Sequence, residues 1–142
     1  MTTQAPDIFG RDIKCDPITE DADEFMTEIT GIPLVMQDLR HRLLTPSVLG
    51  PDGDSDGFFD LRRLLGATAG TAASYQARIK RVALYDQRIK SAQVTVTEVS
   101  TNGFVVTTIT VAGKTALGPF RLAFRLDPSA TTASQVAIIE GQ

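Results

Sequence analysis

Hydrophobic residues recur at helical spacing in two segments of the chain. The first segment predicts a helix that begins near Pro33 and ends at about Leu44. Its apolar face consists of Ile32, Val35, Met36, Leu39 and Leu43. The second predicts a helix over residues 72–84, with an apolar face of Ala72, Tyr75, Ile79, Val82 and Ala83. The only histidine, His41, points away from the first apolar face, so we expect a surface residue rather than a ligand or base.

After residue 90 the pattern changes to twofold alternation, which is typical of half-buried strands. Ala92, Val94 and Val96 alternate with polar residues, and Asn102-Gly103 favours a tight hairpin turn into a second strand over residues 104–111. A third strand with a basic outer face follows over residues 120–126. This order predicts an α+β fold, with N-terminal helices followed by a small antiparallel β-meander of about three to four strands.

The length of 142 residues fits one domain with three parts. Residues 1–29 form an acidic leader arm, whose first 15 residues we expect to be extended and anchored by Ile8, Phe9 and Ile13. Residues 30–127 form the folded core, with a loop at 47–57 and a short buried turn or helix at 58–65. Residues 128–142 form a C-terminal tail, for which a donated strand and a disordered terminus remain open alternatives.

The charge is distributed unevenly along the chain. Residues 1–60 carry a net charge of −9 and residues 61–142 carry +6, which together give −3. The acidic run from Asp16 to Glu28 is either a solvated arm or a surface complementary to a basic one. The overall charge argues against a nucleic-acid-coating role, and we expect no targeting leader and no membrane partner.

One loop has the residue types of a metal site. Asp52, Asp54 and Asp56 precede Gly57 in the pattern of the first half of a calcium loop, with Asp60 at a compatible position. Position 12 is Arg63, where a calcium loop needs a bidentate acid, so the three aspartates are a weak candidate metal site. A calcium-binding interaction module is therefore the alternative function.

Residues suited to catalysis are sparse. The single cysteine allows neither an intrachain disulfide nor a zinc site, and we expect no cofactor. Gly113-Lys114-Thr115 resembles the end of a phosphate-binding loop, but Thr108 stands where that loop needs its first glycine. No nucleophile elbow or acid–base pair is evident, so we expect no enzyme activity, with a cell-wall hydrolase as a distant third hypothesis.

Three segments together resemble the lysozyme-like baseplate wedge family of contractile tails, also called the sheath initiator. These are the helix and its exit at residues 37–46, the apolar stretch at 57–61, and a basic helix followed by Tyr85-Asp86-Gln87-Arg88-Ile89 and a strand. The family has an aromatic residue, Glu, Pro, Arg and Ile at this last place. Here Asp86 replaces the Glu and Gln87 replaces the Pro, and the loop after residue 45 lacks the family's Gly-Glu-Arg element.

The resemblance implies a structural subunit of the inner baseplate wedge of a phage tail, a type VI secretion system or a related injection machine. It implies docking on the wedge core bundle through Tyr85, Asp86 and Arg88, and several copies in each baseplate. It also implies that strands present residues to the tail sheath subunits and nucleate sheath assembly by strand pairing. The implied sheath-facing residues are Phe104, Val106, Phe120, Arg121, Leu122 and Arg125. The implied location is the virion tail baseplate, assembled in the bacterial host cytoplasm.

Overall fold

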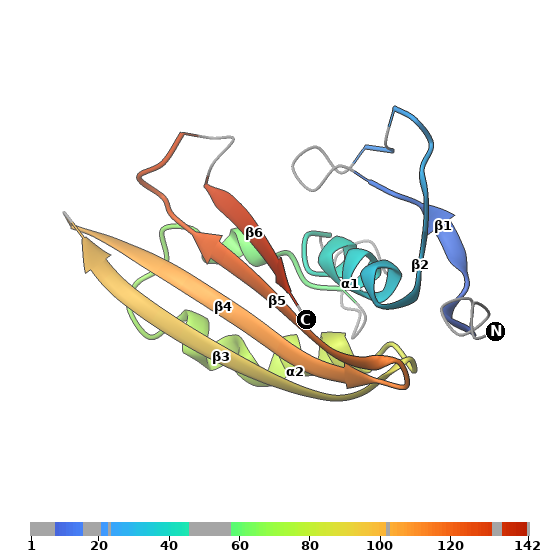
Figure 1. Cartoon of the computed structure of the whole chain (residues 1–142). Helices are drawn as coiled ribbons and strands as arrows, with labels where there is room; N and C mark the ends of the chain where they lie inside the picture. The colour runs from blue at the N-terminus through green and yellow to red at the C-terminus, as the bar shows by residue number, and fades with distance from the viewer. Residues whose placement is uncertain are drawn as a thin grey trace, which may run out of the picture.

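The chain is an α+β protein in the computed structural model, which describes residues 8–15, 21–22, 24–45, 58–101, 103–131 and 135–141 (Figure 1). Its strands are β1 (Arg11–Ile13), β2 (Glu28–Thr30), β3 (Ile89–Thr101), β4 (Phe104–Thr115), β5 (Gly118–Leu126) and β6 (Val136–Gly141). Its helices are α1 (Gly31–Arg42) and α2 (Gln76–Leu84), with 3₁₀ helices at Leu61–Leu64 and Ala72–Tyr75. Within the described residues, neither α-helix is long and apolar enough to cross a membrane.

The helices are not the first elements of the chain, contrary to the sequence-based expectation. Antiparallel strands β1 and β2 precede α1 and pair with each other from Arg11↔Thr30 to Ile13↔Glu28. We call residues 8–30, as far as they are described, the N-terminal arm. Ile8 is exposed and does not anchor this arm, whereas Phe9 and Ile13 are partly buried. The expected extended leader is therefore partly a two-stranded sheet.

A buried glutamine of α1 holds the N-terminal arm in place. The side-chain Oε1 of Gln37 accepts a hydrogen bond from the backbone N–H of Cys15 at 2.8 Å, and its Nε2 donates to the carbonyl of Ile13 at 3.0 Å. The Gln37 side chain thus pairs with the backbone at the C-terminal end of β1 much as a neighbouring strand would. These contacts join residues more than twenty positions apart, which is why hydrophobic periodicity could not reveal them.

The remaining strands form one antiparallel meander in the order β3-β4-β5-β6. Gly103, at a φ of 83°, supports the predicted hairpin between β3 and β4, while Asn102 lies outside the described residues. The fourth strand was not expected as part of the core. Residues 136–141 pair with β5 of the same chain, from Leu126↔Val136 to Arg121↔Gly141, so they are neither donated to a neighbour nor separate from the core in this structure.

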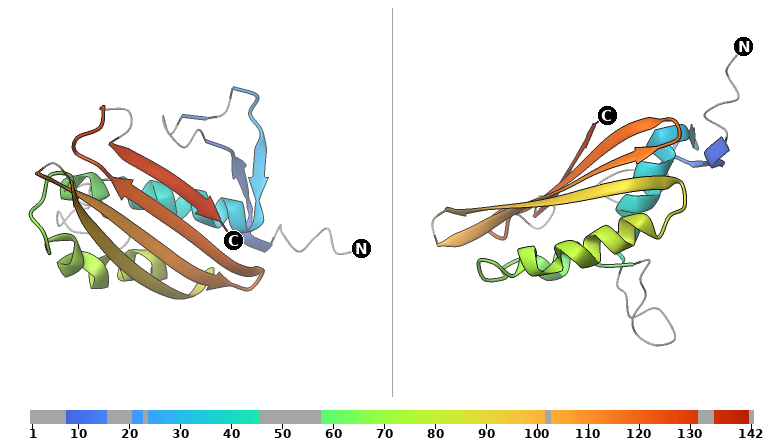
Figure 2. Two further views of the ribbon diagram at one scale, coloured as in Figure 1. Left: turned by 60° about the vertical axis from the view of Figure 1, so that its left-hand side comes forward. Right: turned by 90° about the horizontal axis from the view of Figure 1, so that it is seen from below.

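Both helices pack on one face of this sheet, and α2 runs along β3 (Figure 2). The predicted apolar faces of the two helices are confirmed, because Val35, Leu39, Ile79 and Val82 are fully buried. The expected buried turn is the 3₁₀ helix at Leu61–Leu64. The opposite side of the sheet, which we call the outer face, carries the alternate residues of each strand. No described helix packs on the outer face.

Gly113 lies inside β4, opposite Phe120 of β5. A Cβ atom at this position would lie 2.5 Å from Cε1 and Cζ of the Phe120 ring. Because this ring is buried in the core, the position favours glycine. The Gly-Lys-Thr sequence is thus part of a strand and packs an aromatic ring, and it does not open a helix as a phosphate-binding loop does.

Candidate functional site

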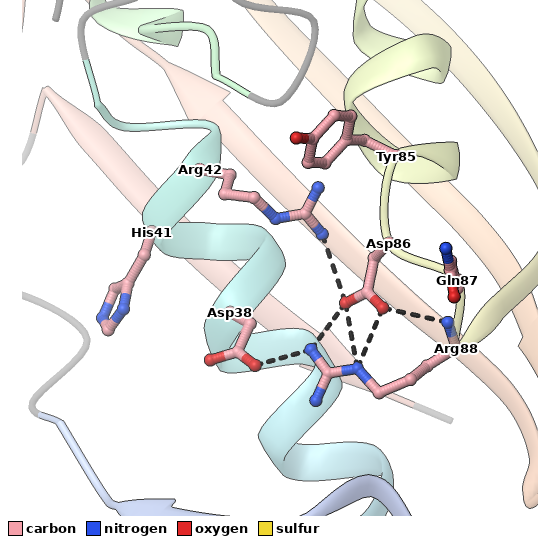
Figure 3. A pocket seen from close by; sticks show the side chains of 7 residues that line it. All are labelled: Asp38, His41, Arg42, Tyr85, Asp86, Gln87 and Arg88. Carbon is pink, nitrogen blue, oxygen red and sulfur yellow. Dashed lines mark hydrogen bonds and ion pairs between the residues drawn. The ribbon is translucent and has the colours of Figure 1, made fainter. Parts of the chain in front are cut away.

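Arg88 lies at the centre of a group of charged residues between α1 and the α2–β3 connection (Figure 3). Its Nε donates to both carboxylate oxygens of Asp86, at 2.9 and 3.1 Å. Its Nη2 donates to Oδ2 of Asp38 at 2.6 Å and also to Asp86, and its Nη1 donates to the carbonyl of Phe9 at 3.2 Å. One planar guanidinium therefore joins the N-terminal arm, α1 and the start of β3.

Asp86 closes the turn that leads from α2 into β3. Its Oδ1 accepts from the backbone N–H of Arg88 at 2.9 Å, and its carbonyl accepts from the N–H of Ile89 at 3.0 Å. A short aspartate side chain that bonds the backbone two residues on is a common turn device. Asp86 therefore helps to define the turn between α2 and β3.

A second arginine reaches the same carboxylate from α1. The Nη2 of Arg42 lies 3.4 Å from Oδ2 of Asp86, and its Nη1 donates to the carbonyl of Val82. Asp38, Arg88, Asp86 and Arg42 thus alternate in charge, and we call these four residues the charged cluster. The cluster is neutral overall, which limits the cost of its partial burial.

Burial and ion pairing act in opposite directions on the titration of the charged cluster. Burial by itself would raise the pKa of Asp86, but the hydrogen bonds and charge of Arg88, with the charge of Arg42, hold this pKa below its usual value. The hydrogen bonds that Arg88 donates to Asp86 raise the pKa of Arg88 despite burial. Burial lowers the pKa of Arg42, although Asp86 partly offsets that effect. The folded state thus favours an ionised Asp86.

A pocket of about 770 Å³ opens beside the charged cluster. It is lined by Asp38, His41, Arg42, Tyr85, Asp86, Gln87 and Arg88. The Tyr85 ring lies beside the Arg42 guanidinium, while the half-buried His41 ring points away from the cluster (Figure 3). Tyr85 is 63% exposed, and an exposed aromatic residue beside arginines is typical of protein-binding surfaces. The arrangement is suited to holding a partner side chain.

The structure brings together the three docking residues expected from the resemblance, but it also adds residues that the sequence did not single out. Asp38 and Arg42 lie four positions apart on one face of α1, a spacing that places charged residues side by side. That spacing could have predicted that Asp38 and Arg42 lie on the same face of the helix. The carbonyl of Phe9 could not be foreseen, because it reaches Arg88 from 79 positions away along the chain.

The expected sheath-facing residues divide between the two faces of the sheet. Phe104, Arg121 and Arg125 are exposed on the outer face, and Val106 is partly buried there. The other two are corrected by the structure, since Phe120 and Leu122 lie in the core beneath the helices and cannot contact a neighbouring subunit. The strand pattern had already predicted this, because the aromatic and leucine positions alternate with the arginines.

The end of the β3–β4 hairpin extends beyond the other strands (Figure 1). The pairing of β4 with β5 begins at Thr107↔Leu126, so residues 104–106 of β4 have no described strand on the β5 side, and residues 99–101 of β3 pair only with them. We call these residues the projecting hairpin. Val99 is 56% exposed on it and Phe104 is 46% exposed. This hairpin combines exposed apolar side chains with unpaired backbone, which favours strand addition.

The candidate calcium loop lies outside the described residues, so Asp52, Asp54 and Asp56 have no structural account. Asp60 accepts hydrogen bonds from the backbone and side chain of Arg62 and begins the 3₁₀ helix. Within the described ranges, no group of three or more His, Cys, Asp or Glu residues is placed to hold a metal ion.

Comparison of the chain with protein-family models, with curated proteins and with solved structures gives no match.

Proposed function

We propose that this chain is a structural component of the inner baseplate wedge of a contractile phage tail or injection machine. In this proposal it docks on the wedge core bundle, nucleates the sheath and catalyses no reaction. The observation that carries the proposal is the β3–β4 hairpin, which extends beyond the other strands of the four-stranded sheet and combines exposed apolar side chains with backbone that no described strand pairs on the β5 side. Such a surface is suited to strand pairing with neighbouring subunits.

The sheath side of the proposal depends on the projecting hairpin. Backbone hydrogen bonds supply affinity in strand addition, and side-chain pockets at alternate positions supply specificity. The exposed side chains of Val99 and Phe104 lie on one face of the hairpin, diagonally across the two strands, because Val99 pairs with Val106 and Phe104 pairs with Thr101. We expect the first sheath subunits to pair with this hairpin and to cover these side chains.

The wedge side of the proposal depends on the pocket at the charged cluster. Arg88 makes its described hydrogen bonds within the chain, so its role is to shape the pocket and to fix the α2–β3 turn. Tyr85 is exposed at the pocket, so a partner can reach its ring. We expect a helix of the wedge core to place a side chain in the pocket against Tyr85.

The proposal can be tested by deleting the gene for this chain and examining the tails that assemble without it. We expect tubes without sheath, and normal tails when the wild-type gene is supplied. Phe104→Asp should leave the chain on the baseplate but prevent sheath assembly, whereas Tyr85→Ala should reduce the amount of chain on the baseplate. Electron microscopy and quantitative mass spectrometry of purified particles distinguish these results.

Lys80→Glu is a matched surface control, because Lys80 is exposed on α2 and belongs to neither surface. This variant should assemble normal tails. Absence of the chain from purified tail particles would refute the proposal, as would normal sheath assembly without the gene. Normal tails from the Phe104→Asp variant would refute the assignment of the sheath surface.

A further inference from the structure

The outer face carries a compact basic and apolar patch beside β6. Ile139 is 60% exposed and lies directly opposite Ala123 of β5. Arg121 and Arg125 flank Ala123 on the same face, two residues away on either side, so an apolar centre has a guanidinium at each end. The two arginines are four positions apart along the strand, which places their Cα atoms about 13 Å apart. We call Arg121, Ala123, Arg125 and Ile139 together the basic patch.

The positive charges on this part of the outer face are incompletely neutralised. Arg125 pairs with Asp127 at 3.4 Å, and Asp127 is also bonded to Ser129. Among the residues that the structure describes, neither Arg121 nor the neighbouring Lys114 forms an ion pair. The patch therefore favours a partner that supplies both carboxylates and an apolar side chain.

The N-terminal arm displays the complementary features at its turn. Phe25 is 80% exposed and Met26 is 61% exposed, which is unusual for adjacent large apolar residues. Glu24 precedes them and Glu28 follows. Glu28 pairs with Arg11 within the arm at 3.4 Å, so Glu24 is the carboxylate beside the apolar pair that can face the guanidinium groups beside Ile139. Met26 has a φ of 52°, a conformation that favours glycine, so the turn displays these side chains at a cost in backbone strain.

We propose that the turn of the N-terminal arm docks on the basic patch of a second copy of this chain. The match of charge and apolar character between two exposed surfaces of the same sequence carries this assignment. A contact between different surfaces of two copies closes into a ring or dimer or continues as a chain. It leaves the projecting hairpin and the charged cluster open to other partners, and it does not depend on the proposed function.

Sedimentation equilibrium and light scattering of the purified protein test this inference. The wild type should have a mass above the 15.3 kDa of the monomer at tens of micromolar in low salt. High salt should weaken association by at least severalfold, because exposed charges are screened. A monomeric wild type under these conditions would overturn the inference and would leave the proposed tail function standing.

Two variants locate the contact. Glu24→Lys with Phe25→Ser alters only the arm, and Arg121→Glu with Arg125→Glu alters only the patch. Each variant should be monomeric and should retain the wild-type circular dichroism spectrum, since all four side chains are exposed. An equimolar mixture should recover a heterodimer, because it still contains one intact arm turn and one intact patch.

The remaining outcomes are equally decisive. Association that persists in either variant, or a mixture that stays monomeric while the wild type associates, would overturn the inference. Lys80→Glu should associate as the wild type does, since this charge change lies on α2. A loss of association in that control would show that net charge rather than the arm and patch controls the mass.

Discussion

The Arg88 guanidinium bonds two carboxylates and one carbonyl oxygen, and an ammonium group cannot reproduce that planar arrangement. Arg88→Lys should therefore lower the free energy of unfolding by about 1–3 kcal/mol, since charge-assisted hydrogen bonds are lost. Urea denaturation followed by circular dichroism measures the change. Arg121→Lys is the control and should have a negligible effect, because that side chain is exposed. Equal stability of the two variants would contradict the structural role of Arg88.

The depressed pKa of Asp86 predicts a dependence of stability on pH. A carboxylate with a lower pKa in the folded state stabilises the protein above the unfolded-state pKa of about 3.9, and this contribution is lost as pH falls through the folded-state pKa. Asp86→Asn should therefore cost about 2–4 kcal/mol at pH 7, the scale for breaking a partly buried ion pair. The difference from wild type should shrink below pH 4.

Denaturation at a series of pH values measures this difference. Asp12→Asn is a suitable control because Asp12 is exposed on β1. A cost of Asp86→Asn that stays constant from pH 7 to pH 3 would contradict the assignment of the shift to the ion pairs with Arg88 and Arg42.

At the scale of elements, hydrophobic periodicity predicted the two helices and the hairpin because each buries one regular face. The helix over residues 72–84 appears as a 3₁₀ turn followed by α2, and its apolar residues are those of the core. The strands β1 and β2 were not predicted, because each has only three residues and depends on contacts with α1. Alternation over three residues is too short to identify a strand.

Gln37 should control the order of the N-terminal arm. In Gln37→Leu the carbonyl of Ile13 and the N–H of Cys15 lose their partner, and an unmet hydrogen bond costs about 1–3 kcal/mol. Hydrogen exchange in peptides covering 11–15 and 28–30 should accelerate by about tenfold or more. Gln93→Leu, on the outer face, should not change these rates. Unchanged exchange in the Gln37 variant would show that other contacts hold the arm.

At the scale of the whole molecule, the candidate site shows what a single sequence can predict. Asp86 and Arg88 are neighbours in sequence, so their proximity was predictable, and so was the Asp38–Arg42 spacing on one helix. The contact between these two pairs was not predictable, because it depends on how α1 lies against the α2–β3 turn. The alternation of residues along β5 predicted which of them lie on the outer face. The apolar centre of the basic patch was not predictable, because it depends on the pairing of β6, which places Ile139 beside the arginines.

The two isoleucines of β6 test whether the C-terminal strand belongs to the cooperative fold of its own chain. Ile138 packs against the core and Ile139 points to the outer face, so adjacent residues of the same type differ only in their surroundings. Ile138→Ser should lower the free energy of unfolding by about 1–3 kcal/mol through lost apolar burial. Ile139→Ser should change it by less than about 0.5 kcal/mol, as is usual at exposed sites. Denaturation at low protein concentration measures both, and equal small effects would show that residues 136–141 do not pair with β5 in solution.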